Sequence, residues 1–127
     1  MAISRADRNQ GIERILSDLS ALRGVTTAAL VDADGLVTHI RRDFEMDSDA
    51  LGAAAQIMFT SARRAASQVN QEDTRLVLSE NAQGLVILAP LNKDFVLVLV
   101  ADSTGMLGTI RFEIRETVVE LNNLLGR

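Results

Sequence analysis

The sequence predicts an α/β fold of three layers, in which a five-stranded antiparallel sheet lies between helices in the order α-β-β-α-β-β-β-α. Apolar residues recur at helical spacing in three segments, one near each end of the chain and one in the middle. Five short β-prone runs lie between these segments, and the turns that join neighbouring runs are too short for parallel crossovers. Two of the runs are almost continuously apolar, so we expect helices on both faces of the sheet.

The first helix and the hairpin after it are predicted from spacing and turn chemistry. The helix is expected at about residues 8–22, where apolar and charged side chains alternate at intervals of three and four residues. Its apolar positions are Ile12, Ile15, Leu16, Leu19 and Leu22. Gly24 follows as a helix stop. Strands are expected at residues 25–31 and 36–41, and Gly35 between them can adopt the positive φ of a tight turn.

The second helix is predicted at about residues 49–69, with Asp47 or Ser48 as its N-terminal cap. It is rich in alanine, and one side carries an apolar stripe with small residues beside it. The stripe consists of Leu51, Ala55, Met58, Ala62, Ala65 and Val69, and the small residues beside it are Gly52, Ala53, Ala54 and Ala66. One side of this helix must cover the sheet. The remaining small-residue surface permits the close approach of a second helix.

Three further strands are predicted at residues 73–80, 84–91 and 94–101. The first of them alternates apolar and polar residues, as expected for an edge strand. Edge strands need either a partner strand or protection. In one interpretation, two copies of the chain pair through this strand and pack their second helices together. In the other, Arg75 and Glu80 protect the edge of a monomer by their charge.

The loop before the last helix is predicted to start that helix rather than to bind a phosphate. Asp102, Ser103 or Thr104 is expected to cap the helix, and Gly105 and Gly108 are expected to allow tight packing. A strand, a glycine-bearing loop and a helix are also the layout of phosphate-binding loops. Here the glycines form only G-x-x-G, no lysine follows them, and Asp102 would repel a phosphate. We therefore do not predict a nucleotide site.

The composition excludes several classes of function. The 127 residues carry a net charge of −4 and include no Trp and no Tyr, which argues against nucleic-acid binding. The absence of Cys excludes disulfides, thiolate zinc sites and thiol nucleophiles. The longest apolar run is too short for a transmembrane helix, so we expect a cytoplasmic protein without membrane insertion. We expect one domain over residues 1–127, with its core at about 8–126.

No catalytic, metal or cofactor site is predicted. Asp32 and Asp34 are spaced as in a calcium loop, but the positions of that loop's first and last ligands hold Leu30 and Arg41. His39 is the single histidine, no nucleophile pattern accompanies it, and it is expected to face solvent. An enzyme is therefore not expected.

Three stretches of the sequence resemble the Roadblock domain family, which includes a dynein light chain. The stretch "GVTTAALVDADGLVTHI" is similar to the family's first hairpin, and "LGAAAQIMFTSARRAASQV" resembles its small-residue second helix. The stretch "VLVLVADSTGMLGTIRFEIRETVVELNNLL" is similar to its last strand and helix. The resemblance covers about residues 8–126 and implies a profilin-like sandwich of the Roadblock type.

The resemblance also implies a homodimer with one continuous sheet and a partnership with Ras-like small GTPases. Bacterial members similar to this chain include gliding-motility regulators that activate a GTPase by positioning its own catalytic groups. We therefore expect a GTPase-activating or GTPase-positioning protein that needs no cofactor. The residues expected at the dimer interface are Ala54, Ala55, Met58, Ala62, Leu76 and Val77, and those expected to contact the GTPase are Arg63, Arg64 and Gln68.

Other interpretations stay open. Arg63 and Arg64 could form an ordinary solvated helix edge instead of a contact for an acidic partner or a phosphate. A passive scaffold would dimerise and bridge other proteins without changing GTP hydrolysis. A small-molecule sensor would need a pocket with converging polar groups, of which the sequence offers few.

Overall fold

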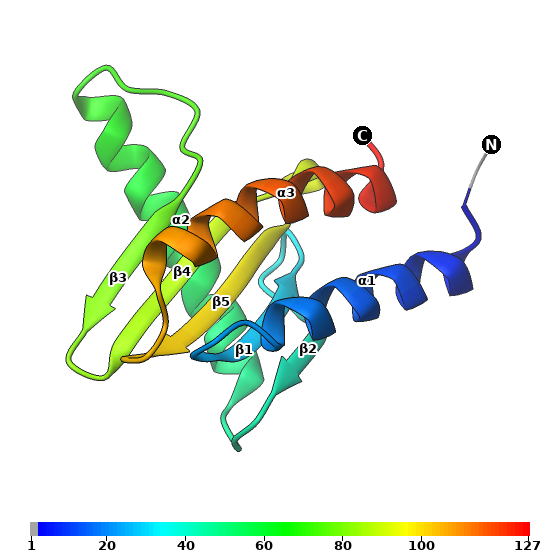
Figure 1. Cartoon of the computed structure of the whole chain (residues 1–127). Helices are drawn as coiled ribbons and strands as arrows, with labels where there is room; N and C mark the ends of the chain where they lie inside the picture. The colour runs from blue at the N-terminus through cyan, green and yellow to red at the C-terminus, as the bar shows by residue number, and fades with distance from the viewer. Residues whose placement is uncertain (1–2) are drawn as a thin grey trace.

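The chain has the predicted order of helices and strands in a computed structural model that describes residues 3–127 (Figure 1). A short 3-10 helix, η1, is added between the last two strands. The elements are α1 (Arg5–Ser20), β1 (Val25–Val31), β2 (Val37–Arg42), α2 (Ser48–Gln68), β3 (Val77–Asn81), β4 (Gly84–Pro90), η1 (Asn92–Asp94), β5 (Val96–Asp102) and α3 (Leu107–Leu125).

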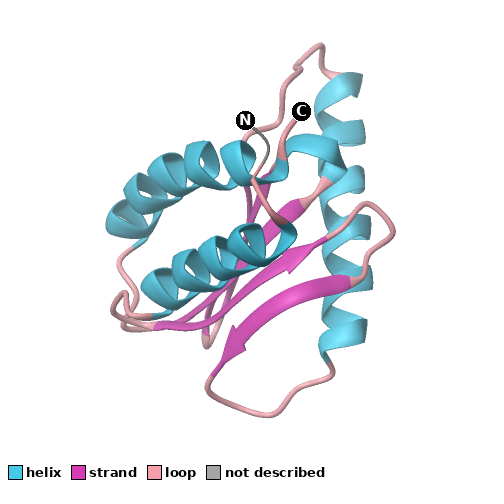
Figure 2. Ribbon diagram, turned by 90° about the vertical axis from the view of Figure 1, so that its right-hand side faces the viewer, coloured by secondary structure: helices cyan, strands magenta, loops and turns pink. Residues whose placement is uncertain are grey.

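The five strands of the described residues form one antiparallel sheet in the order β2-β1-β5-β4-β3. The strands β2 and β3 are therefore its edges, and the prediction of an edge strand after the second helix is confirmed. Helices α1 and α3 lie side by side on one face, and α2 crosses the other face alone (Figure 2). This arrangement is the predicted three-layer sandwich.

Each face of the sheet has its own hydrophobic core. The core under α1 and α3 is the larger one, and long aliphatic side chains such as Leu16, Leu99 and Leu121 are fully buried in it. The core under α2 is smaller and includes Ala29, Val98 and Phe59. The absence of Trp and Tyr is thus matched by cores built almost entirely from aliphatic residues.

The first helix and hairpin follow the prediction with small shifts. Helix α1 starts earlier than expected, because the Ser4 side chain accepts a hydrogen bond from Asp7 N at 3.1 Å and caps it. The hairpin turn is closed by Asp32 Oδ1, which accepts hydrogen bonds from Asp34 N and Leu36 N. Gly35 adopts φ +83°, as the turn requires.

The predicted start of β3 is wrong. The strand begins at Val77, because the chain leaves α2 through Asn70 and Asp73, both at positive φ, and these bend the segment away from extended geometry.

The predicted cap of the last helix is also wrong. Met106 occupies the N-cap position without a side-chain cap, and Asp102 Oδ1 instead accepts a hydrogen bond from Thr104 N at 2.9 Å. Asp102 therefore closes the turn that precedes α3. A Cβ on Gly105 would lie 3.0 Å from the Ala101 Cβ, so the prediction of tight packing is confirmed there. Nothing lies within 4 Å of a Cβ on Gly108, where that prediction is wrong.

Within residues 3–127, no helix combines the length and the apolar character needed to cross a membrane.

Candidate functional site

The candidate site is built on α2, which uses a narrow side of its surface to cover the sheet. Its buried residues are Gly52, Ala55 and Phe59, and Leu51 and Met58 pack at the margin of the same core. The predicted apolar stripe therefore does not coincide with the side of the helix that faces the sheet, and its centre lies beside that side. The bulky ring of Phe59, which the predicted stripe leaves out, decides which side is buried.

Ala55 must be corrected as a dimer-interface candidate. Its side chain is only 3% exposed because the sheet of its own chain covers it. A residue in this position has almost no surface left to offer a second copy. The other dimer candidates on α2 keep accessible surface, since Ala54 is exposed and Met58 and Ala62 are half-buried, and their roles stay predictions.

One flank of α2 is apolar and only partly covered. We call it the apolar flank, and it consists of Ala54, Met58, Ala62, Ala65 and Val69. Met58 and Ala62 are half-buried, whereas Ala54, Ala65 and Val69 are exposed. Residues at intervals of three and four lie along one side of a helix, so the flank forms a continuous strip of mostly small side chains. Such a strip permits the close approach of another helix.

A second strip on α2 points away from the sheet. We call it the outer stripe, and it consists of Ile57, Ser61, Arg64 and Gln68, all of them exposed. Ile57 is 68% exposed, although it is a large apolar residue. Ile57 was not among the residues predicted from the sequence. Once the buried side of α2 is known, the position of Ile57 opposite Ala55 and Phe59 indicates that its side chain is exposed.

The neighbouring arginines Arg63 and Arg64 point to different sides of α2, because successive residues of an α-helix are about 100° apart. The Arg63 guanidinium lies 5.5 Å from the centroid of the Phe59 ring, within the range of a cation–π contact. Arg63 also lines a groove with Asp73 and Asp94. Arg64 lies on the outer stripe, so the structure separates the two residues that the sequence predicted to act together.

Gln56 fixes α2 to two turns at one end of the sheet. Its Nε2 donates hydrogen bonds to Asp32 O at 2.8 Å and to Asp94 O at 3.0 Å. These acceptors lie in the β1–β2 turn and in η1. Gly52 brings the helix equally close to the first turn, since a Cβ there would lie 2.4 Å from Gly35 O. The helix is thus held in place from the side opposite the apolar flank.

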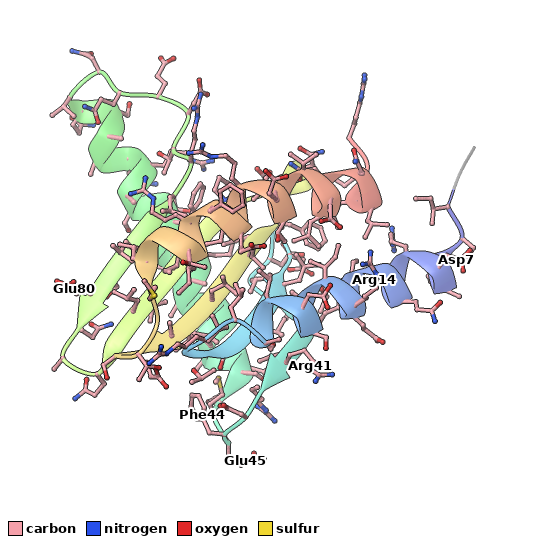
Figure 3. All side chains as sticks on the ribbon, in the orientation of Figure 1. Asp7, Arg14, Arg41, Phe44, Glu45 and Glu80 are labelled. Carbon is pink, nitrogen blue, oxygen red and sulfur yellow. The ribbon has the colours of Figure 1, made fainter. Side chains whose placement is uncertain are left out.

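The strand β3 provides an open edge near α2. It pairs with β4, and no strand of the described residues pairs with its other side. Leu76, which was predicted on the pairing strand, lies directly before β3 and packs against the core under α1 and α3, whereas Val77, the first residue of β3, packs against the core under α2. The side chains of these two dimer candidates therefore lie on opposite faces of the sheet. Figure 3 shows Glu80 on the outer side of β3, where a charge limits unspecific pairing.

Among residues 3–127, no group of three or more His, Asp or Glu side chains is placed to hold a metal ion. His39, which was predicted to face solvent, is half-buried on β2 beside Arg8 and Ile12 of α1. Burial lowers the pKa of His39 from its ordinary value; the Glu13 carboxylate partly opposes this effect and Arg8 adds to it. Its Nδ1 lies 3.0 Å from Thr38 Oγ1.

The sequence pattern of the Roadblock/LC7 domain matches residues 11–101. The chain belongs to this family. An uncharacterized protein of Methanocaldococcus jannaschii is 24% identical to it over 110 residues, which are 87% of this chain and 96% of the relative. The assignment agrees with the resemblance found in the sequence.

Two solved structures show the same fold as this Roadblock chain. MglB of Myxococcus xanthus matches it with a TM-score of 0.85 at 17% identity, over 98% of this chain and 94% of that one. The gliding protein MglB of Thermus thermophilus matches it with a TM-score of 0.84 at 16% identity, again over 98% and 94%. Identities this low establish the fold alone.

Proposed function

We propose that this Roadblock protein is a homodimeric regulator of a Ras-like small GTPase and has no catalytic site of its own. The observation that carries the proposal is the exposed surface of α2, where a small-residue flank and a separate outer stripe lie on one helix. The likeness to gliding-motility proteins of the MglB type supports it.

The dimer would form through the open edge of β3 and the apolar flank. Pairing β3 with its copy gives the unpaired backbone groups of that edge their hydrogen bonds and joins two sheets into one. The same two-fold axis would bring the two α2 helices together. Ala54, Met58 and Ala62 then bury side chains that a monomer leaves partly exposed.

The GTPase would contact the outer stripe. Arg64 is exposed and forms no ion pair with any residue of the described chain, so its charge is available to an acidic partner. Ile57 adds an apolar anchor about two helical turns away, and Gln68 adds hydrogen-bonding groups. A surface of this kind can hold the mobile segments of a GTPase in the arrangement that hydrolysis requires.

The decisive experiment uses a purified Ras-like GTPase from the same organism and measures single-turnover GTP hydrolysis with and without this protein. A regulator accelerates hydrolysis. Binding without any change in rate would support the passive scaffold instead. If the protein neither binds the GTPase nor changes its rate, the proposal is wrong.

Two variants and a control separate positioning from a catalytic arginine. We expect Arg64→Ala to weaken association while hydrolysis at saturation stays near the wild-type rate. A catalytic arginine inserted into the GTPase would instead be worth a factor of about 10³ or more at saturation. Arg63→Ala tests the second candidate in the same way. Arg41→Ala, which removes an exposed arginine of β2 rather than of α2, serves as the control.

A further inference from the structure

A second surface lies on the opposite face of the sheet from α2. A groove of about 670 Å³ runs between α3 and the segment that leads into β3. Its apolar lining includes Leu76, Ile114 and Val118, and three arginines, Arg75, Arg111 and Arg115, lie around it. The groove therefore combines an apolar floor with a positively charged rim.

The spacing on α3 explains why one side of this helix builds the groove. Arg111, Arg115 and Val118 follow one another at intervals of four and three residues, which places them along a single helix side. Ile114 is buried beside them and joins the groove to the core. The opposite wall comes from Arg75 and Leu76, directly before β3.

The groove is open because α3 packs on β4 and leaves the edge strand uncovered on this face (Figure 1). Side chains alternate between the two faces of a strand, so Leu78 lies on the same face as Leu76. Leu78 is 40% exposed. The apolar floor thus continues along β3 beyond the groove itself.

The charge of the groove contrasts with that of the whole chain. The chain has a net charge of −4, but no acidic side chain lines this groove. Within the described residues, none of the three arginines forms an ion pair. The acidic residues of α3, which are Glu113, Glu116 and Glu120, do not line it either. Among the described residues, the groove is thus lined by three arginines and by no carboxylate that pairs with them.

We propose that this groove binds an acidic amphipathic helix of another protein. Arginine pairs with carboxylates through two parallel hydrogen bonds, and the apolar floor accepts aliphatic side chains on the same side of such a helix. A membrane is a poorer fit, because the apolar residues line a concave surface rather than protrude. A nucleic acid is a poorer fit as well, because the groove has no aromatic side chain and the chain is acidic.

This interaction goes beyond the proposed regulation of a GTPase, since the groove and α2 lie on opposite faces of the sheet. A partner could therefore occupy the groove while α2 contacts the GTPase. The protein would then link the GTPase to a second protein, and each contact can be lost without the other.

The test uses the whole protein and fluorescein-labelled helical peptides. Their leucines are spaced by three and four residues, and the flanking positions carry glutamate in one set and lysine in a matched set. Fluorescence anisotropy gives the affinities. We expect the acidic set to bind, the lysine set to bind at least about tenfold more weakly, and added salt to weaken the acidic set.

The variant pair Arg111→Glu with Arg115→Glu should weaken binding of the acidic peptides by about tenfold or more. Arg41→Glu is the control for a charge change elsewhere and should leave binding unchanged. Circular dichroism verifies that the double variant and the control are folded. We expect both to fold, because the substituted residues Arg41, Arg111 and Arg115 are all exposed.

Four results would overturn the proposal. The first is that no peptide of the acidic set binds below about 1 mM. The second is equal binding of the acidic and lysine sets, or of wild type and the double variant. The third is a change of oligomeric state in the double variant, which would make the groove an interface between copies. The fourth concerns a membrane. If Arg111→Glu with Arg115→Glu removes binding to phosphatidylserine–phosphatidylcholine vesicles but leaves binding of the acidic peptides unchanged, the groove binds a lipid surface instead.

Discussion

The two faces of the sheet are built differently. Under α1 and α3, two helices bury a large aliphatic core, and Leu16, Leu99 and Leu121 are shielded from solvent. Under α2, one long helix covers the sheet with three buried residues of its own and leaves most of its surface exposed. The first face therefore buries the larger hydrophobic core, whereas the second leaves more of its covering helix open to solvent.

The largest expected effect comes from the core under α1 and α3. Leu121→Ala removes most of a fully buried side chain and should lower the free energy of unfolding by about 2–5 kcal/mol. Val119→Ala on the same helix is the control, since Val119 is 61% exposed and its loss should cost less than about 0.5 kcal/mol. Urea unfolding measures both. Equal losses would contradict the division between core and surface.

Next in size is a pair of glycines on helices of opposite faces. Gly52→Ala places a Cβ 2.4 Å from Gly35 O and should cost about 1–3 kcal/mol, because the helix must move away from the hairpin. Gly108→Ala meets no atom within 4 Å and should stabilise the protein by up to about 1 kcal/mol. Thermal unfolding measures both changes. Stabilisation by Gly52→Ala would show that α2 is not held tightly against the β1–β2 turn.

A smaller effect is expected at two neighbouring threonines of β1. Thr27 is fully buried, and its Oγ1 has no hydrogen-bond partner within the described residues. Thr27→Val should therefore leave stability unchanged or raise it by about 1 kcal/mol. Thr26 Oγ1 donates to Val100 O at 3.3 Å, so Thr26→Val should instead be neutral or slightly destabilising. A clear loss of stability in Thr27→Val would indicate that its hydroxyl has a partner after all.

The smallest effect concerns the single histidine. Burial favours the neutral form of His39, so its pKa in the folded protein should lie below the ordinary value of 6.5. The resulting contribution to stability is present above the unfolded-state pKa and is lost as the pH falls through the lowered pKa of the folded state. An NMR titration of the one imidazole measures this pKa. Glu13→Gln should lower it further, and Arg8→Ala should raise it.

The element order was predictable because it depends on local signals. The spacing of Ile12, Ile15 and Leu16 predicts a helix, and the Asp32–Gly35 turn predicts a hairpin, without knowledge of the rest of the chain. The edge position of β3 followed from its alternating pattern. These predictions depend on periodicity and turn chemistry, both of which a short window of sequence contains.

The orientation of α2 was not predictable in the same way. Many alanines give the helix several sides of similar hydrophobicity, so periodicity alone does not choose between them. The contact of Phe59 with the sheet makes the choice, and it placed Ala55 inside the protomer. The predicted N-terminal cap of α3 was wrong because the Asp102 side chain accepts its hydrogen bond within the turn that precedes the helix.

The proposed function depends most directly on the apolar flank of α2 as the surface that joins two copies of the chain. Sedimentation equilibrium at micromolar concentration tests this on wild type, on Ala54→Glu, which adds a charge to the flank, and on Ala53→Glu, which adds the same charge on another side of the helix. We predict that wild type and Ala53→Glu are dimers and that Ala54→Glu is a monomer. A monomeric wild type, or a dimer that Ala54→Glu leaves intact, would contradict the claim.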